Sequence, residues 1–256
     1  MAMRSGCVCC GDLGIDGMED GIRLNKYLSA VGFCSRREAD RLIEEGKVHI
    51  DGKQAFVGMK VCRNQEILVD GHLIERDDRE RILLLVNKPT GIVCTTAKQE
   101  QGNIVDYLHY PKRIYPIGRL DKDSRGLLLM TNVGGLHNEI TRVARGHEKE
   151  YIVTVNKRID SAFVKKMSQG VYIPELDYQT MPAKVKKLSQ RSFSIVLKEG
   201  KNRQIRRMCK ALSYHVYDLQ RIRIMHFTLK DIQEGMYRSA TDDEWDMLMR
   251  TVKADF

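Results

Sequence analysis

Two carboxylates, Asp121 and Asp123, stand in a charged segment directly before an apolar run. The segment GRLDKDSRG spans residues 118–126, and the run LLLM follows it at Leu127–Met130. Charged residues usually stay off a core strand, whereas a strand can hold the loop before it. A carboxylate that is rigidly held, ionised in a partly dry cleft and paired with a cation can do chemistry. Either aspartate is also consistent with an ordinary loop carboxylate bonded to nearby amides.

A source of cations follows at residues 198–223, a segment that contains eight Lys or Arg residues and only two acids. A helix that starts near Asn202 is expected here. It places cations at positions i, i+3, i+4 and i+7 of one side, namely Arg203, Arg206, Arg207 and Lys210. Its core side carries Ile205, Met208, Cys209 and Leu212. The density of cations favours a phosphate-binding stripe over a solvated basic face.

The composition is that of a basic protein with a sizeable core. The chain has 256 residues, 42% hydrophobic and 30% charged, which suits one large domain with a small one. The net charge of +9 attracts polyanions, either nucleic acid or an anionic membrane surface. No apolar run reaches the roughly 18–20 residues of a membrane span, and no signal-peptide pattern opens the chain. We therefore expect a cytoplasmic protein with reduced thiols.

The cysteines do not form a zinc pattern. Cys7, Cys9 and Cys10 give the sequence CVCC, but zinc sites need pairs at C-x₂₋₄-C spacing and usually a second pair. The other cysteines are scattered singly, so we expect no metal. Residues 1–21 are glycine-rich and acidic and are predicted to be a disordered tail.

A small helical and β-hairpin unit is predicted from Ile22 onward. Residues 23–32 read as a short amphipathic helix, and residues 35–46 read as a second helix opened by a capping box. Asp51-Gly52 is a strong hairpin signal. Arg36 and Arg37 fall in the first turn of the second helix, where free N–H groups and arginines together favour phosphate. A solvated basic face is the alternative.

Residues 71–81 read as a charged linker, after which strands and helices are mixed. Strands are expected in RIYPIG, LLLMTN, EYIVTV, SFSIVL and MHFTL, and helices in DSAFVKKMSQG and RQIRRMCKALSY. Because the strands are not each followed by a helix, we expect an α+β fold with a mostly antiparallel mixed sheet flanked by helices.

Two resemblances cover nearly the whole chain. The stretch RLNKYLSAVGFCSRREADRLIEEGKVHIDGK resembles the S4 domain, an RNA-binding module of ribosomal proteins and RNA-modifying enzymes. In order, NKPTGIVCTT, GRLDKDSRGLLLMTN, EKEYIVTV and EGKNRQIRRM resemble the motifs of RsuA-type pseudouridine synthases, which modify ribosomal RNA and carry an N-terminal S4 domain. The resemblance implies an S4 domain at 22–70, a linker at 71–81 and a catalytic domain at 82–253.

The resemblance also implies roles for single residues. Asp121, the Asp of R-L-D, is implied to be the nucleophile, Tyr151 to pack against the target base, and Arg206 to pair with Asp121. Substrate-binding residues are implied at Arg119, Lys149, Ile205, Arg203 and Arg207. RNA contacts of the S4 domain are implied at Arg23, Lys26, Ser35, Arg36 and Arg37. Arg125 and its neighbours are expected to face phosphate.

The implied reaction breaks the N1–C1′ bond of uridine, rotates the uracil and rejoins it through C5. No redox step or net hydrolysis occurs, so neither cofactor nor metal is expected. Attack at C1′, proton removal at C2′ to give a glycal, and attack at C6 all remain open. The implied partner is a structured stem-loop of ribosomal RNA, most of all 23S, bound by a monomer without a membrane. A non-catalytic S4-type RNA-binding or ribosome-assembly protein, and a synthase for 16S rRNA or tRNA, are the alternatives.

Overall fold

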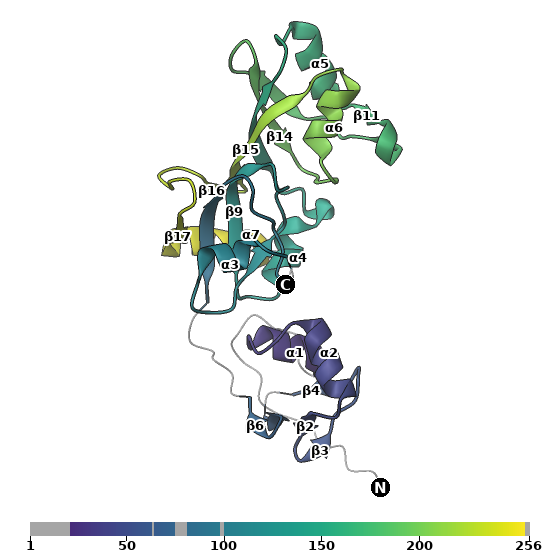
Figure 1. Ribbon diagram of the computed structural model, residues 1–256, viewed down its shortest axis with the longest axis vertical. Helices are drawn as coiled ribbons and strands as arrows, with labels where there is room; N and C mark the ends of the chain where they lie inside the picture. Colours follow the sequence, from purple (N-terminus) through teal and green to yellow (C-terminus); the bar gives the residue numbers. More distant parts are fainter. Residues whose placement is uncertain (1–20, 63, 75–80, 98–99, 254–256) are drawn as a thin grey trace. The chain divides into compact units, whose positions relative to one another are not determined.

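The computed structural model describes residues 21–62, 64–74, 81–97 and 100–253 (Figure 1). The chain divides into two compact units, Met1–Arg81 with Lys253–Phe256, and Ile82–Val252. The expected disordered tail and the CVCC sequence lie outside the described residues. Within the described part of the chain, no helix is long and apolar enough to cross a membrane.

The first unit packs two helices on small antiparallel sheets. The helices are α1 (Leu24–Ala30) and α2 (Arg36–Glu44). One sheet has the order β3-β2-β5-β6, with β2 at Val48–Ile50, β3 at Lys53–Gln54, β5 at Ile67–Val69 and β6 at His72–Leu73. β1 (Ile22–Arg23) pairs with β4 (Lys60–Val61). Strand β6 pairs with β5, so the sheet continues beyond the boundary expected at residue 70.

The helix cap and the hairpin turn predicted for this unit are both formed, the capping box only in part. Ser35 Oγ accepts a 3.2 Å hydrogen bond from the amide of Glu38 and caps α2. The Glu38 carboxylate pairs with Arg41, so only half of the expected capping box is formed. Asp51 and Gly52 both have positive φ, 50° and 76°, and close the predicted hairpin between β2 and β3.

The second unit is built on a nine-stranded sheet with the order β13-β14-β10-β15-β9-β7-β17. Its strands are β7 (Leu83–Lys88), β8 (Tyr115–Ile117), β9 (Arg125–Thr131), β10 (Lys149–Val155), β13 (Lys184–Lys187), β14 (Ser192–Leu197), β15 (Val216–Ile224), β16 (Phe227–Thr228) and β17 (Tyr237–Ser239). β8 pairs with β9, and β16 with β15. β11 (Tyr172–Ile173) and β12 (Tyr178–Gln179) form a separate pair. Only β15 and β9 run parallel among the described strands, which confirms the mostly antiparallel prediction.

Helices cover both faces of the centre of this sheet. They are α3 (Ile104–Leu108), α4 (Leu136–Thr141), α5 (Ser161–Gln169), α6 (Gln204–Ala211) and α7 (Asp242–Lys253), with short 3₁₀ turns at Val143–Arg145 and Pro174–Leu176. Along β7, Leu84 and Val86 pack in one core and Leu83 and Leu85 in another. Because both faces are buried, the central strands are apolar runs without alternation. Figure 1 shows α5 and α6 beside β14 and β15, away from α4 and α7.

The parallel pairing at the centre of the sheet depends on Gly126. Arg221 of β15 pairs with Gly126 of β9, whose φ is 103°. A Cβ at residue 126 would lie 2.3 Å from the carbonyl oxygen of Arg221, so a side chain there is excluded. The close approach brings β15 against the strand that follows the charged loop.

Candidate active site

The charged loop that carries Asp121 is a hairpin loop. It joins β8 to β9, which pair in antiparallel register from Tyr115 opposite Thr131 to Ile117 opposite Leu129. Inside the loop, the amide of Ser124 donates to the carbonyl of Asp121 at 3.1 Å. The Asp121 side chain is 30% exposed. The strands therefore hold a carboxylate at the rim of the sheet, as the apolar run predicted.

A fully buried lysine holds one end of this loop. Lys88, at the end of β7, has no exposed surface. Its Nζ donates to the carbonyl oxygens of Ser124 at 2.7 Å and of Pro89 at 2.8 Å. Burial lowers the pKa of Lys88, and the charges of Asp123 and Asp121 act in the opposite direction. Lys88 is thus a cation near the two carboxylates, but its own hydrogen bonds go to backbone carbonyls.

A buried arginine holds the outer residues of the same loop. Arg221 is 3% exposed, and its Nε donates to the carbonyl of Leu127 at 2.7 Å. Its Nη1 lies 3.4 Å from the carbonyl of Arg119. Arg221 also stands directly opposite Tyr151 in the β10–β15 pair, so the two side chains share one face of the sheet. Its Nη2 is buried without a hydrogen-bond partner.

Arg206 bonds to the backbone of the loop. It was expected to pair with Asp121, and it does not. Its Nη2 donates to the carbonyl of Asp123 at 2.7 Å and lies 3.2 Å from Ser124 Oγ. Its Nη1 donates to the carbonyl of Val216 at 3.2 Å, and its Nε is 3.5 Å from the Asp123 carboxylate. The two terminal nitrogens of Arg206 are therefore bonded to loop and strand oxygens, and its ion pair among the described residues is with Asp123, not with Asp121.

The cation that reaches Asp121 is Arg203, whose Nη1 lies 3.7 Å from Asp121 Oδ2. Arg203 also binds Asp123 through two hydrogen bonds of 2.9 and 2.8 Å. This guanidinium holds the pKa of Asp123 below its usual value. Contrary to prediction, α6 begins at Gln204, and Arg203 precedes it in the left-handed region with φ 50°. That conformation takes Arg203 off the helical stripe and turns it to the carboxylates.

The expected base-binding residues lie in one buried cluster. Tyr151 on β10 is 8% exposed, Ile205 on α6 is 4% exposed, and both belong to the same apolar core. Lys149, two residues before Tyr151 and so on the same face, is half-buried and contacts the carbonyl of His147 at 3.4 Å. Burial and then the charge of Arg221 lower the pKa of Lys149.

Arg125, expected to face phosphate, is instead paired with acids. It binds Asp218 through two 2.9 Å hydrogen bonds and reaches Glu234 at 3.4 Å. Arg207 contacts the carbonyl and side-chain oxygens of Asn202 at 3.1 and 3.3 Å. In the S4-like unit, the five residues expected to bind RNA are all at least partly exposed, namely Arg23, Lys26, Ser35, Arg36 and Arg37.

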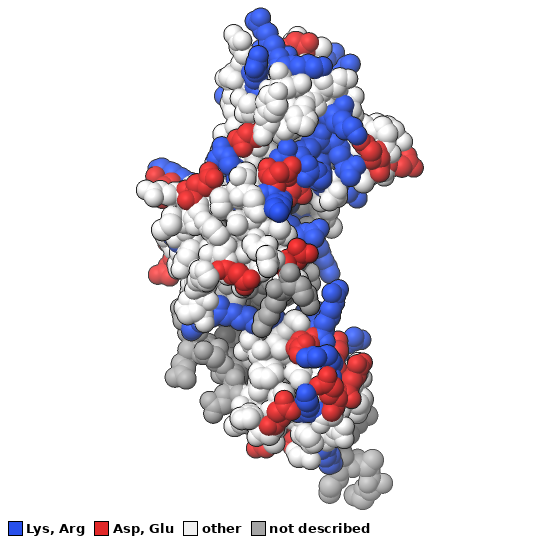
Figure 2. Space-filling view, in the orientation of Figure 1, with Lys and Arg blue, Asp and Glu red and all other residues white. Residues whose placement is uncertain are grey.

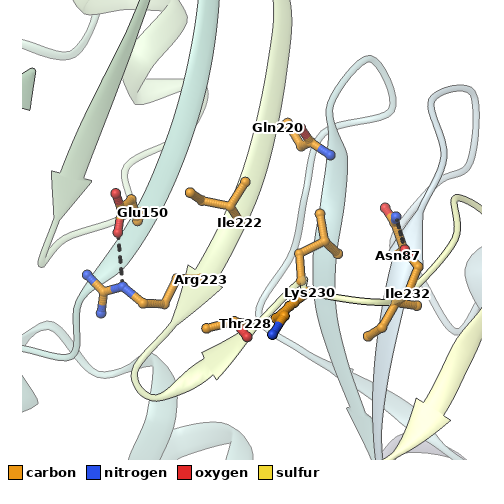
Figure 3. A pocket seen from close by; sticks show the side chains of 9 residues that line it. Asn87, Glu150, Gln220, Ile222, Arg223, Thr228, Lys230 and Ile232 are labelled. Carbon is orange, nitrogen blue, oxygen red and sulfur yellow. Dashed lines mark hydrogen bonds and ion pairs between the residues drawn. The ribbon is translucent and has the colours of Figure 1, made fainter. Parts of the chain in front are cut away.

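Two hollows of about 530 Å³ lie on the second unit, Ile82–Val252. One is lined by α6, by Asp123 and by the start of β15, and Figure 2 shows Lys and Arg gathered over α6. The other, drawn in Figure 3, is lined by Glu150, Gln220 and Arg223, and it contains the 3.0 Å Glu150–Arg223 pair. Neighbouring strand residues point to opposite faces. This second hollow therefore lies on the face away from Tyr151 and Arg221.

Sequence reasoning missed three residues of the site. Lys88 and Arg221 hold the loop, and Cys94 Sγ accepts a 3.4 Å hydrogen bond from the amide of Leu120. A lysine at the end of the apolar run 83–86 was the available signal for Lys88. Nothing local marked the other two, since their partners are distant in the chain. In the described residues, no group of three or more His, Cys, Asp or Glu could hold a metal.

The geometry is a carboxylate on a short hairpin loop, next to the basic helix α6, with the loop bonded to the arginine that stands opposite the buried Tyr151 in the sheet. The profile of the RNA pseudouridylate synthase family matches residues 82–211, and that of the S4 domain matches residues 22–72. The chain therefore belongs to the RNA pseudouridine synthase family, a family of isomerases, and carries an S4 domain.

Named relatives agree with this assignment. The chain is 50% identical over 227 residues to the dual-specificity RNA pseudouridine synthase RluF of Escherichia coli (strain K12), with 88% of this chain and 78% of the relative covered. It is 36% identical over 232 residues to the ribosomal large subunit pseudouridine synthase B of Bacillus subtilis (strain 168), covering 87% and 93%. A crystal structure of a pseudouridylate synthase superposes with a TM-score of 0.66 at 28% identity, covering 89% of this chain and all of that one. The 50% identity supports the resemblance to RluF within the family.

Proposed function

We propose that this protein converts a specific uridine of ribosomal RNA, most of all 23S rRNA, to pseudouridine. One observation carries the proposal. Asp121 is fixed on a loop whose carbonyls accept from Lys88, Arg206 and Arg221, while its own carboxylate stays 30% exposed and reaches only one ion pair among the described residues. A rigid, accessible carboxylate is what a nucleophile or base requires. The name of the Bacillus subtilis relative supports the large subunit as substrate.

In this proposal, Asp121 acts on the sugar or base while Tyr151 receives the flipped uracil. The C1′, C2′ and C6 routes all begin from the carboxylate of Asp121, whose Oδ2 lies 3.7 Å from Nη1 of Arg203. The target base leaves its stack and packs on the Tyr151 ring beside Ile205. The C5 hydrogen leaves and N1 gains one, so the isomerisation balances without cofactor or metal. We infer that the protein acts as a monomer in the cytoplasm, where ribosomal RNA is modified.

The substrate is tested with unmodified transcripts of 23S rRNA, 16S rRNA and tRNA that carry 5-tritiated uridine. We expect tritium release from the 23S transcript, and a pseudouridine map of cellular RNA should lose one large-subunit position when the gene is deleted. Tritium release from 16S rRNA or tRNA alone would show that this RNA, and not 23S rRNA, is the substrate. Binding without release from any transcript would make the chain a non-catalytic RNA-binding protein.

Tyr151 is expected to act through its ring. Tyr151→Phe keeps the stacking face and removes only the hydroxyl, so kcat should stay within about tenfold of wild type. Tyr151→Ala removes a stacking surface worth on the order of 1–3 kcal/mol, and kcat should fall further. Tritium release under single-turnover conditions measures both. An inactive Tyr151→Phe enzyme would show that the hydroxyl takes part in a proton transfer.

The S4-like unit is expected to bind phosphates of the RNA. Replacing Arg36 and Arg37 together by Ala should weaken RNA binding and flatten its salt dependence, by roughly 0.7–0.9 in the slope of log K against log salt for each phosphate that is no longer neutralised. Turnover at saturating RNA should change little. Arg41→Ala is the matched control, because that arginine of α2 is already paired with Glu38 and Glu45. If the double variant had the same slope of log K against log salt as the control, Arg36 and Arg37 would be surface residues that do not contact RNA phosphates.

A further inference from the structure

We propose that the hollow beside α6 binds the nucleotide next to the target uridine, with its base stacked on Tyr217 and its phosphate on Arg207 and Lys210. This hollow is called the α6 hollow below. The inference rests on the proposed function and adds a second nucleotide site to it. The occupant is single-stranded RNA, continuous with the strand whose uridine enters at Asp121.

The α6 hollow borders the charged loop that carries Asp121. Asp123, two residues after Asp121, lines it, as does Arg206, which donates to the Asp123 carbonyl at 2.7 Å. The hollow measures about 530 Å³, within the range of small-ligand sites. A strand that delivers one base to Tyr151 places a neighbouring nucleotide near the loop, and this hollow is a basic depression that borders it.

The charges of the α6 hollow suit a phosphate. Four cations line it, Arg203, Arg206, Arg207 and Lys210, against the two acids Asp123 and Glu175. Arg203 is held by Asp123, and Lys210 pairs with Glu175 at 2.7 Å while remaining 75% exposed. Arg207 has no ion pair with any acid of the described residues and contacts only oxygens of Asn202. A guanidinium in that state is available for a phosphate, which it can bind through two parallel hydrogen bonds.

An aromatic platform stands next to these cations. Tyr217 lines the α6 hollow and is 66% exposed, which is high for a tyrosine on the long central strand β15. Its ring is held by the neighbouring His215 in an edge-to-face arrangement, with centroids 5.7 Å apart and planes at 72°. Proteins bind single-stranded RNA by combining exposed aromatic rings with a basic groove. The ring and Arg207 together therefore offer both halves of a nucleotide site.

Two variants of the α6 hollow should fail with different salt signatures. On the 23S transcript, Tyr217→Ala should raise Kd and KM by roughly 5- to 150-fold with an unchanged salt slope, because stacking releases no counterions. Tyr217→Phe should behave as wild type. Arg207→Ala should also weaken binding but should flatten the slope by roughly 0.7. Tyr237→Ala, a 40% exposed tyrosine on the edge strand β17, is the matched control.

Crosslinking places the nucleotide directly. A 23S transcript substituted with 4-thiouridine is irradiated in complex with the full chain, and we expect the crosslinked peptide to contain Tyr217 or His215. Tyr217→Ala that binds like the control, or a crosslink at no residue of the α6 hollow, would overturn the inference. Wild-type tritium release from the same transcript separates this failure from a failure of the proposed function, because release requires only the site at Asp121.

Discussion

Asp121→Asn is expected to abolish isomerisation while RNA binding survives. The substitution keeps the size of the side chain and the loop's backbone bonds to Lys88, Arg206 and Arg221, but it removes the negative charge on which every route depends. We expect kcat to fall by roughly a thousandfold or more, as with the loss of other nucleophiles. Tritium release at saturating RNA measures the loss, and filter binding of the same transcript should give a Kd within about threefold of wild type.

Asp123→Asn is the matched control in the same loop. Asp123 is 48% exposed and is paired with Arg203, which lowers its pKa. A lowered pKa means that the ion pair stabilises the fold at neutral pH, and that this contribution is lost as the pH falls through about 4 and below. Because the pair is half-exposed, its loss should cost at most about 1 kcal/mol, and kcat should stay within about tenfold. An inactive Asp123→Asn with an active Asp121→Asn would reverse the assignment of the nucleophile.

The sequence predicted those parts of the fold that local patterns encode. The strand after the charged loop was predicted because Leu127–Met130 is apolar, and it forms β9. The helices α5 and α6 were predicted from spacing, and the buried face of α6 carries Ile205, Met208 and Cys209 as expected. Strand β15 was missed because VYDLQRIRI mixes polar and charged residues with apolar ones. Its charges are satisfied by tertiary partners such as Arg125 with Asp218, which no local pattern shows.

The roles of the candidate site residues stay predictions, but the structure shows which of the expected pairings form. Asp121, Tyr151 and Ile205 were named from motifs, yet the partners of the arginines came out differently. Arg203 approaches Asp121 in place of Arg206 because α6 starts one residue after Arg203, and a left-handed residue cannot be inferred from helical spacing. Buried cations that bind carbonyls leave no trace in charge patterning, since a carbonyl is present at every residue. Lys88 and Arg221 therefore required the structure.

Arg221→Met is expected to reduce kcat by roughly a hundredfold with little change in KM. Methionine fills similar space but donates nothing, so the carbonyls of Arg119 and Leu127 lose their partner on either side of Asp121. The bond to Leu127 is buried and the contact to Arg119 is part-buried. A buried carbonyl left unpaired costs about 1–3 kcal/mol, and the loop is expected to shift to reach new donors. A displacement of about 1 Å at a reacting group can cost about a hundredfold in rate. Arg221 is thus a positioning residue, acting on Asp121 through the backbone.

Arg221→Lys separates positioning from charge. Lysine keeps the cation beside Tyr151, but without the planar fork it can bond only one of the two carbonyls well, so kcat should recover only part of the way. If the charge alone mattered, Arg221→Lys would turn over at the wild-type rate.

Met167→Ala serves as a control for stability, because it opens a cavity under α5 that costs about 2–5 kcal/mol and leaves the loop bonds intact. Circular dichroism melts rank the three variants by stability, and tritium release is then compared well below the lowest melting temperature. A loss of kcat that follows melting temperature, with Met167→Ala as slow as Arg221→Met, would reduce Arg221 to a purely structural residue. A slow Arg221→Met beside a fast Met167→Ala of equal stability would establish that the carbonyls of the nucleophile loop must be held for Asp121 to react.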